Sequence, residues 1–180
     1  MAFASAPDDP AALKLLAAAD AAVALDASYG PAHLERGRIL LVLGRAPEAL
    51  SALDLGARLA PNDAEAQSAF GVALLATGRT QEALDRFRRA SELDPNDADR
   101  LVNLGTAYMM RTRTAEAIDA FERAVRLAPT DARAEGDLGT AYLGIHKAEE
   151  ALPHLKRAVV LDPSRATFLS NLGYAHLLRG

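Results

Sequence analysis

The sequence predicts an all-α solenoid of antiparallel helix pairs, with about ten helices, and three observations lead to this prediction. Half of the 180 residues are apolar but only 5% are aromatic, and the apolar fraction is mostly Ala and Leu, which favour helices. Several residue types recur at a step of 34 along the chain, which is typical of stacked helical repeats. Within each step, apolar residues follow a helical period in two halves that are separated by a break.

The step of 34 residues is shared by independent columns of the sequence, and it defines the domain organisation. We predict four full repeats at residues 30–63, 64–97, 98–131 and 132–165, preceded by an N-terminal segment and half-repeat helix at 1–29 and followed by a half-repeat helix at 166–180. The columns are Pro61, Pro95, Pro129 and Pro163; Gly37, Gly71, Gly105, Gly139 and Gly173; Glu48-Ala49, Glu82-Ala83, Glu116-Ala117 and Glu150-Ala151; and Leu59, Leu93, Leu127 and Leu161.

The elements can be justified in chain order. Residues 11–26 fit the second helix of a degenerate repeat, because Ala19, Ala22 and Leu25 keep the step while Ala27 replaces the proline. The first full repeat departs from the others at His33, Arg36 and Gly56. The next two repeats are regular. In the fourth, we expect Pro153 to lie in the first turn of its helix, where proline is tolerated. Residues 166–179 form the first helix of a fifth repeat.

The residues at the helix boundaries predict how each helix starts and stops. Gly44 and Gly78 lie at the break between the two helices of a repeat, where glycine suits a helix C-terminus, and the third repeat breaks around Thr112-Arg113. After the break, Thr80 and Thr114 are predicted N-caps, with Glu82 and Glu116 in the first turn. The predicted N-caps of the following first helices are Asp63, Asp97 and Asp131.

Two kinds of column predict the packing inside each repeat. The Gly and Ala columns let two helix backbones approach closely, and one column of large apolar residues fills the remaining space. Burial of each large residue stabilises the fold by roughly 1.5–3 kcal/mol. The large column consists of Leu53, Phe87, Phe121 and Leu155.

Residues 101–131, LVNLGTAYMMRTRTAEAIDAFERAVRLAPTD, resemble the consensus of the tetratricopeptide repeat (TPR) family. The 34-residue period, the L-G-x-x-Y and A-x-x-x-F patterns and the closing proline are specific in combination. The resemblance covers residues 30–165 as four full repeats. It implies a right-handed superhelix with a concave groove lined by the first helices, and it implies that the groove binds a peptide or a partner protein.

The resemblance also indicates which columns face the groove. Asn103 and Asn171 lie in a column that some family members fill with Asn to bind a peptide backbone, and an Asn amide can donate and accept at once. Met109 and Met110 would be adaptable apolar contacts, although plain packing explains them equally well. The predicted partner-binding residues are Glu35, Arg38, Leu41, Val72, Leu75, Val102, Asn103, Thr106, Met109, Met110, Asp137, Thr140, Asn171 and Tyr174.

The same columns argue against one known ligand of the family. Binding of an acidic chaperone tail needs Lys and Asn in these columns, but Leu34 and Arg38 stand where the first Lys and Asn would be, and Asp99 replaces a further Lys. The groove is apolar in the middle and carries charges of both signs, with Arg38 and Arg133 against Glu35, Asp99 and Asp137. An amphipathic or extended apolar segment is therefore the expected ligand.

Several function classes are not supported by the sequence. A net charge of −4 argues against a nucleic-acid surface. The chain has no Cys and four His without metal-ligand spacing, so we expect no metal site and no cofactor. No catalytic motif stands out, and we predict that the protein is not an enzyme. Residues 1–10 do not read as a signal peptide, and no stretch predicts a membrane span. We expect a cytoplasmic location, with the periplasm as the alternative if a signal peptide was removed.

The predicted ends of the solenoid look unfinished, which leaves three functions open. The last helix is apolar around much of its circumference between Phe168 and Leu178, and such a patch usually marks an interface. The leading prediction is a protein-protein interaction module that binds a partner in the groove. The alternatives are the recognition domain of a larger enzyme, such as a glycosyltransferase, and a scaffold that self-associates through this last helix.

Overall fold

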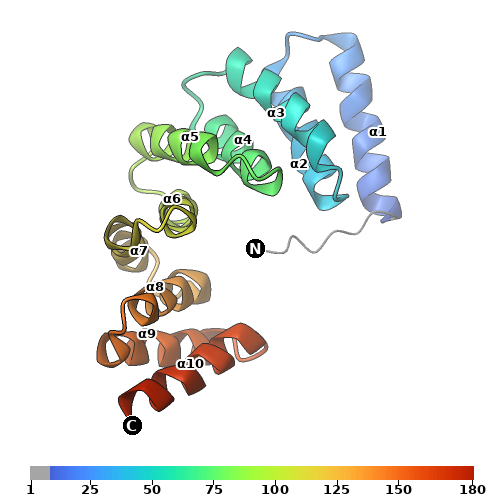
Figure 1. Cartoon of the computed structure of the whole chain (residues 1–180). Coiled ribbons are helices and arrows are strands. Elements are labelled where there is room, and N and C mark those ends of the chain that lie inside the picture. The colour runs from blue at the N-terminus through green and yellow to red at the C-terminus, as the bar shows by residue number, and fades with distance from the viewer. Residues whose placement is uncertain (1–8) are drawn as a thin grey trace. The chain divides into compact units, whose positions relative to one another are not determined.

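The computed structural model describes residues 9–180, and this part of the chain folds into ten α-helices without a β-strand (Figure 1). Residues 1–8 of the predicted N-terminal segment lie outside the described residues. The all-α prediction is confirmed. The helices are α1 (Pro10–Leu25), α2 (Gly30–Val42), α3 (Ala46–Leu59), α4 (Ala64–Ala76), α5 (Thr80–Leu93), α6 (Ala98–Met110), α7 (Thr114–Leu127), α8 (Ala132–Gly144), α9 (Ala148–Leu161) and α10 (Ala166–Arg179).

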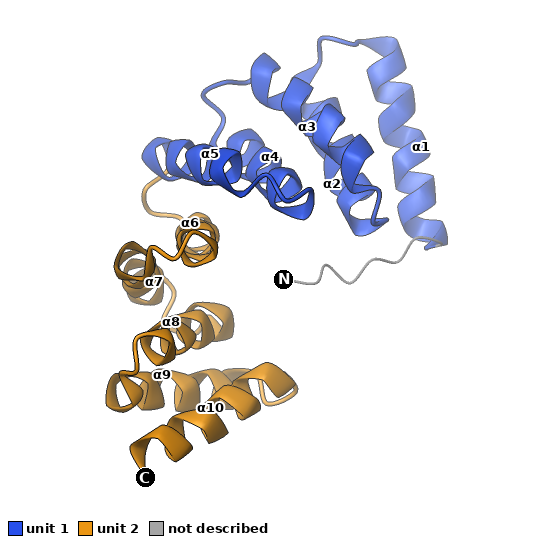
Figure 2. Ribbon diagram, viewed as in Figure 1, with its two compact units in different colours: residues 1–93 blue, residues 94–180 orange. Residues whose placement is uncertain are grey.

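The helices alternate between the two types that the repeat predicts. We call the first helix of each repeat an A helix (α2, α4, α6, α8 and α10) and the second a B helix (α1, α3, α5, α7 and α9). The chain divides into two compact units, residues 1–93 and 94–180 (Figure 2). In unit 1, α1 to α5 pack in chain order and α2 also contacts α4.

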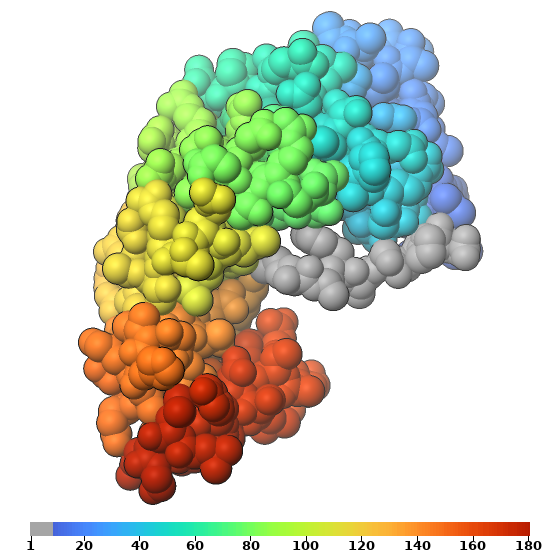
Figure 3. Space-filling view, in the orientation of Figure 1, coloured from blue at the N-terminus to red at the C-terminus, as the bar shows by residue number. Residues whose placement is uncertain are grey.

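Unit 2 is built in the same way from α6 to α10. Each helix packs against the next, and the A helices also contact each other, α6 with α8 and α8 with α10. In the space-filling view of Figure 3 the side chains of this unit form one continuous body, from the yellow of α6 to the dark red of α10. A cluster that includes Leu101, Ala117 and Phe121 is almost completely buried and forms the core of the first repeat of the unit.

In each full repeat, the column glycine of the A helix lies directly beneath the large side chain of the B helix. A Cβ built on Gly105 would lie 2.5 Å from Phe121 Cε1, and one on Gly71 would lie 2.7 Å from Phe87 Cε1. On Gly139 it would lie 2.6 Å from Leu155 Cγ, and on Gly37 it would overlap Leu53. The predicted close approach is therefore present in all four full repeats. In α10, by contrast, a Cβ on Gly173 would meet nothing within 4 Å.

The three predicted Asp caps of A helices are present, but the two predicted Thr caps of B helices are not. The Asp97 carboxylate accepts from Arg100 N at 3.0 Å, and Asp63 and Asp131 cap α4 and α8 in the same way. The predicted N-cap Thr114 is instead the first residue of α7, and Arg113 holds the cap position without a side-chain cap bond. Thr80 likewise begins α5 and its hydroxyl contacts the Gly78 carbonyl oxygen. The prediction for these threonines is wrong.

An ion pair across the first turn occupies the place of the missing caps. Arg113 contacts Glu116 at 2.7 Å, and the Arg79 hydrogen bonds lower the pKa of the Glu82 carboxyl. The acidic partner is the third residue of each B helix from α3 to α9, where a negative charge interacts favourably with the helix dipole. The same pair recurs at the step of the repeat, as Arg45–Glu48 and Arg79–Glu82 at 2.5 Å and as Lys147–Glu150 at 3.4 Å.

The break between the A and B helices requires a left-handed residue in every full repeat. Gly44 and Gly78 adopt φ values of 72° and 78°, which glycine tolerates. In the third and fourth repeats Thr112 and His146 occupy this position at φ 56° and 59°. A left-handed conformation costs a non-glycine residue roughly 1–2 kcal/mol, so these two turns are locally strained.

Two other expectations for single residues are resolved by the structure. Pro153 is the sixth residue of α9, so the expectation that it lies in the first turn is wrong, and its missing N–H removes one bond of the helix. The unusual His33 is buried, and its Nε2 lies 2.9 Å from the Ala27 carbonyl oxygen. This histidine therefore ties α2 to the turn before it.

The contact between glycine and the large residue can be tested with a matched pair of variants. Gly105→Ala should lower the free energy of unfolding by about 1–3 kcal/mol, because the new methyl group overpacks against Phe121. Gly173→Ala lies on the same column of an A helix but in open space, so it should raise stability by roughly 0.5–1 kcal/mol through helix propensity. Urea denaturation measures both values. Equal effects of the two substitutions would contradict the packing argument.

The strained turn gives a second test. Thr112→Gly should raise the free energy of unfolding by about 0.5–1 kcal/mol, because relief of the left-handed strain exceeds the extra entropy of the unfolded chain. Thr112→Ala is the control, since it removes the same side chain but keeps the strained φ. Thermal unfolding followed by circular dichroism compares them, and a gain shared by both variants would argue against strain.

Candidate functional site on the A helices

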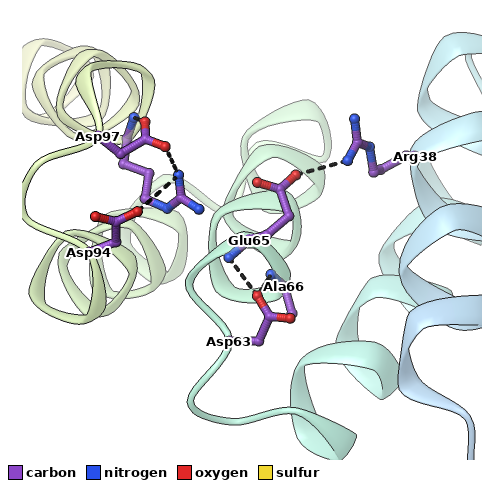
Figure 4. Close-up of polar contacts among 7 residues, drawn as sticks. Arg38, Asp63, Glu65, Ala66, Asp94 and Asp97 are labelled. Atoms are coloured by element: carbon purple, nitrogen blue, oxygen red, sulfur yellow. Dashed lines mark hydrogen bonds and ion pairs between the residues drawn. The ribbon is translucent and has the colours of Figure 1, made fainter.

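The candidate site is the face of the A helices on which the predicted partner-binding columns lie, and it is described within each unit. In unit 1, Arg38 of α2 and Glu65 of α4 form an ion pair at 3.0 Å (Figure 4). Asp63 caps the start of α4 beside Glu65, because the backbone N–H of Glu65 donates to the Asp63 carboxylate at 2.8 Å. The predicted residues Glu35 and Arg38 are exposed, and Leu41, Val72 and Leu75 are partly exposed. The structure therefore places five predicted residues on the surface of α2 and α4.

In unit 2 a hydrogen-bonded arginine joins α6 to α8. Arg133 Nη2 donates to Asn103 Oδ1 at 2.7 Å, and Arg133 Nε lies 3.8 Å from the Asp137 carboxylate. Burial raises the pKa of the Asp137 carboxyl above its ordinary value, while the Arg133 charge acts in the opposite direction. Sequence reasoning placed Asn103 and Asp137 in one column and set Arg133 against Asp137 in the groove, but it missed the hydrogen bond from Arg133 to Asn103. Arg133 lies one helical turn before Asp137, and this spacing brings their charges together.

A second hydrogen-bonded chain joins α8 to α10. Asn171 Nδ2 donates to Thr140 Oγ1 at 2.8 Å, and the Thr140 hydroxyl donates to the Gly136 carbonyl oxygen at 2.7 Å. Thr106 makes the equivalent bond to the Val102 carbonyl oxygen at 2.8 Å. Because its amide nitrogen is held by Thr140, the Asn171 side chain has a fixed orientation in which its carbonyl oxygen is the group left to accept from a ligand.

The apolar members of the predicted site separate into buried and exposed residues. Val102 is completely buried in the core of α6 and α7, so its prediction as a binding residue is corrected, and the reason is that its side chain points between the helices. Met109 is partly buried against the same core. Met110 and Tyr174 are 54% and 50% exposed. They are the large apolar side chains that this face of unit 2 offers to a ligand.

A further arginine, which the sequence did not single out, stabilises the start of α6. Arg100 contacts Asp97 and lies 3.9 Å from Asp94, and its side chain is only 13% exposed (Figure 4). Asp97 is also the N-cap of α6. These contacts make the start of α6 a fixed part of unit 2.

The described part of the chain offers little for small-molecule chemistry. Within residues 9–180 no group of three or more His, Asp or Glu side chains is arranged to hold a metal ion. An open depression of about 360 Å³ between α6 and α7 is lined by Leu104, Tyr108 and Arg123, among others, and it contains no residue of the predicted site. None of the helices in this part of the chain is long and apolar enough to cross a membrane.

Solved structures of other proteins have the same fold. A structure of MamA from Desulfovibrio magneticus RS-1, residue 41 to the end, is 29% identical, with a TM-score of 0.74 over 83% of this chain and 85% of that chain. Another MamA structure is 26% identical, with a TM-score of 0.73 over 84% and 88%. YrrB, described as a TPR protein with an unusual peptide-binding site, is 24% identical, with a TM-score of 0.73 over 88% and 82%. The YrrB likeness concerns the fold alone.

The family assignment rests on the sequence itself. No curated protein sequence matches this chain significantly. A family model described as tetratricopeptide repeat matches residues 68–132 and 137–180, which is more than half of the chain. With the 34-residue step, the alternating A and B helices and the glycine beneath each large residue, this protein belongs to the tetratricopeptide-repeat family.

Proposed function

We propose that this protein is an interaction module that binds a peptide or an extended segment of a partner protein on the face of its A helices. Repeats of this family are generally non-catalytic scaffolds, and the residues on this face fit such a role. The observation that carries the proposal is the pair of hydrogen-bonded links in unit 2, Arg133 to Asn103 and Asn171 to Thr140, which fix polar side chains on three consecutive A helices.

The chemistry of this face favours a ligand that is partly apolar. Met110 and Tyr174 provide exposed apolar surface at α6 and α10, and a methionine side chain adapts to ligands of different shape. On α10, three residues before Tyr174, the Asn171 oxygen can accept from a peptide N–H. The partly buried Asp137 and Arg133 compensate each other's charge, so a strongly charged ligand gains little. An amphipathic or extended apolar segment remains the proposed ligand class.

The alternative of a recognition domain in a larger enzyme shares this binding face, including the exposed Tyr174. Both functions use the same face, because a recognition domain also binds a segment of its substrate protein. They differ in whether a catalytic domain is encoded in the same reading frame. The proposed binding chemistry is the same in both cases, and the experiment below tests that shared chemistry.

A peptide-display screen tests the proposal with matched variants. The wild-type chain should select a motif, and a Met110→Glu, Tyr174→Ala variant should bind that motif at least about tenfold more weakly, which corresponds to roughly 1.4 kcal/mol. The control is Val160→Glu, because Val160 is 72% exposed on the B helix α9 and lies off the proposed face. Isothermal titration calorimetry with the selected peptide gives each affinity.

Two outcomes would count against the proposal. If no motif is selected by the wild type, the A-helix face does not bind short linear ligands. If the motif is selected but only Val160→Glu weakens it, the ligand binds on the B helices. We leave Asn103 unchanged in this test, since its removal would take away the acceptor of the Arg133 Nη2 hydrogen bond and alter this face.

A further inference from the structure

One position on the B helices carries a large side chain in the second and fourth repeats but a small one in the third. Arg86 on α5 and His154 on α9 lie at this position, and the step of 34 residues places Ala120 of α7 between them. The open depression of about 360 Å³ between α6 and α7 is lined by Ala120. The third repeat therefore has space beside its A helix at the place where the two neighbouring repeats have a side chain.

In the second repeat, Arg86 covers the A helix. Its guanidinium lies 4.9 Å from the centroid of the Phe70 ring, and its Nη1 donates to Gln67 Oε1 at 3.1 Å. The depression at this place in unit 1, of about 310 Å³, is bounded by charged side chains of α5 and does not extend to α4, because the arginine lies over Phe70. Its lining residues are Glu82, Asp85, Arg86 and Arg89.

In the fourth repeat, His154 fills the same place. Its ring stacks on Tyr142 of α8, with the two centroids 5.9 Å apart and the planes inclined by 16°. Its Nδ1 lies 2.7 Å from the carboxylate of Glu135, which is buried. The occupants in the second and fourth repeats thus share three properties. Each is planar, each lies against an aromatic ring of its A helix, and each has a polar partner at its inner end.

In the third repeat this place is open and its inner wall is apolar. Leu104 and Tyr108 of α6 line the depression, and the polar residue at the inner end is replaced by Leu101, which is fully buried. A charged or amide group at the inner end would lose its hydrogen bonds to water without a partner in exchange, which is unfavourable. In the first repeat the position is again an alanine, Ala52, but Arg36 stands in the column of Leu104. An alanine beside an apolar A-helix wall is therefore particular to the third of the four full repeats.

We propose that this depression binds an aromatic side chain of a partner protein, at the place that Arg86 and His154 fill in the neighbouring repeats. An aromatic ring is planar like these two side chains, needs no hydrogen bond at its inner end and can pack against Tyr108. The volume is at the lower end of the roughly 300–1,000 Å³ that is typical of ligand pockets, which suits one inserted side chain. The site shares no residue with the A-helix face and does not depend on the function proposed for that face.

The charges at the rim of the depression balance, which agrees with an uncharged occupant. Glu116 is paired with Arg113 at 2.7 Å, and the other two charged groups, Asp119 and Arg123 on α7, have opposite signs. The rim therefore favours neither an acidic nor a basic side chain. Asp119 is exposed and Arg123 is partly exposed, so they can accept from and donate to the backbone on either side of an inserted residue.

Nuclear magnetic resonance of the full chain, with N-acetyltryptophanamide as the probe, tests the site. The backbone amide signals of Leu104, Tyr108 and residues 115–123 should shift in a saturable way, because a bound aromatic ring shifts nearby resonances. Ala120→Arg and Ala120→His should each weaken this binding at least about tenfold, since each places in the depression the side chain that a neighbouring repeat has there. Both variants should fold, because the same residues are accommodated at this position in α5 and α9.

Val160→Arg is the matched control variant. It adds an arginine on α9 at a position that is 72% exposed and that holds Arg58 in α3 and Arg126 in α7, so it should bind the probe like the wild type. The control probes are N-acetylleucinamide and N-acetylargininamide, and both should bind at least about tenfold more weakly than the aromatic probe. The amide spectrum shows whether each variant is folded, and Ala120→His decides alone if Ala120→Arg is not.

Three results would exclude an aromatic site in this depression. The first is that the wild type shows no saturable shifts at the lining residues. The second is that the folded variants of Ala120 bind the aromatic probe as tightly as the wild type does. The third is that the leucine or the arginine probe binds as tightly as the aromatic one, which would indicate a general apolar surface or a cation site instead.

Discussion

The fold depends on one contact that recurs in each complete repeat, where the absence of a side chain on an A helix makes room for the largest side chain of its B helix. Phe121 fills the space above Gly105, and a single added carbon there would lie within 2.5 Å of the ring. Because interiors are packed as closely as organic crystals, this contact fixes how near the two helices lie. The buried alanines of the B helices, such as Ala117 and Ala124, follow from the same short separation. The helix pair is thus a rigid unit whose outer residues are free to vary.

The turns show that the repeat tolerates locally unfavourable backbone conformations where the packing between the paired helices requires them. The break between the helices demands a left-handed residue, and Thr112 and His146 adopt that conformation although glycine would adopt it without strain. Pro153 removes a hydrogen bond from α9, yet the helix continues to Leu161. In both cases the packing of the large column against its glycine outweighs the local preference. The ion pair in the first turn, such as Arg113 with Glu116, stabilises the start of the helix. It is repeated in each B helix after α1.

The sequence predicted the fold more completely than the candidate site, for a physical reason. Periodic columns report burial, so Gly105, Phe121 and the Asp97 cap could be placed before any coordinates were known. Contacts between polar side chains on neighbouring helices have no fixed spacing, and the link from Arg133 to Asn103 was therefore missed. Val102 was misplaced because its column faces the core in the neighbouring repeats too, where Ser68 and Gly136 are also buried. The threonine caps were wrong because the ion pair of Arg113 competes for the same helix end, and propensity alone does not decide between them.

Stacked repeats make contacts mainly with their nearest neighbours, and this leaves one side of each A helix for the proposed binding of a partner. The face of the A helices is present in each repeat, so its side chains can change without loss of the fold, and Met110 and Tyr174 are exposed there while the glycine column stays buried.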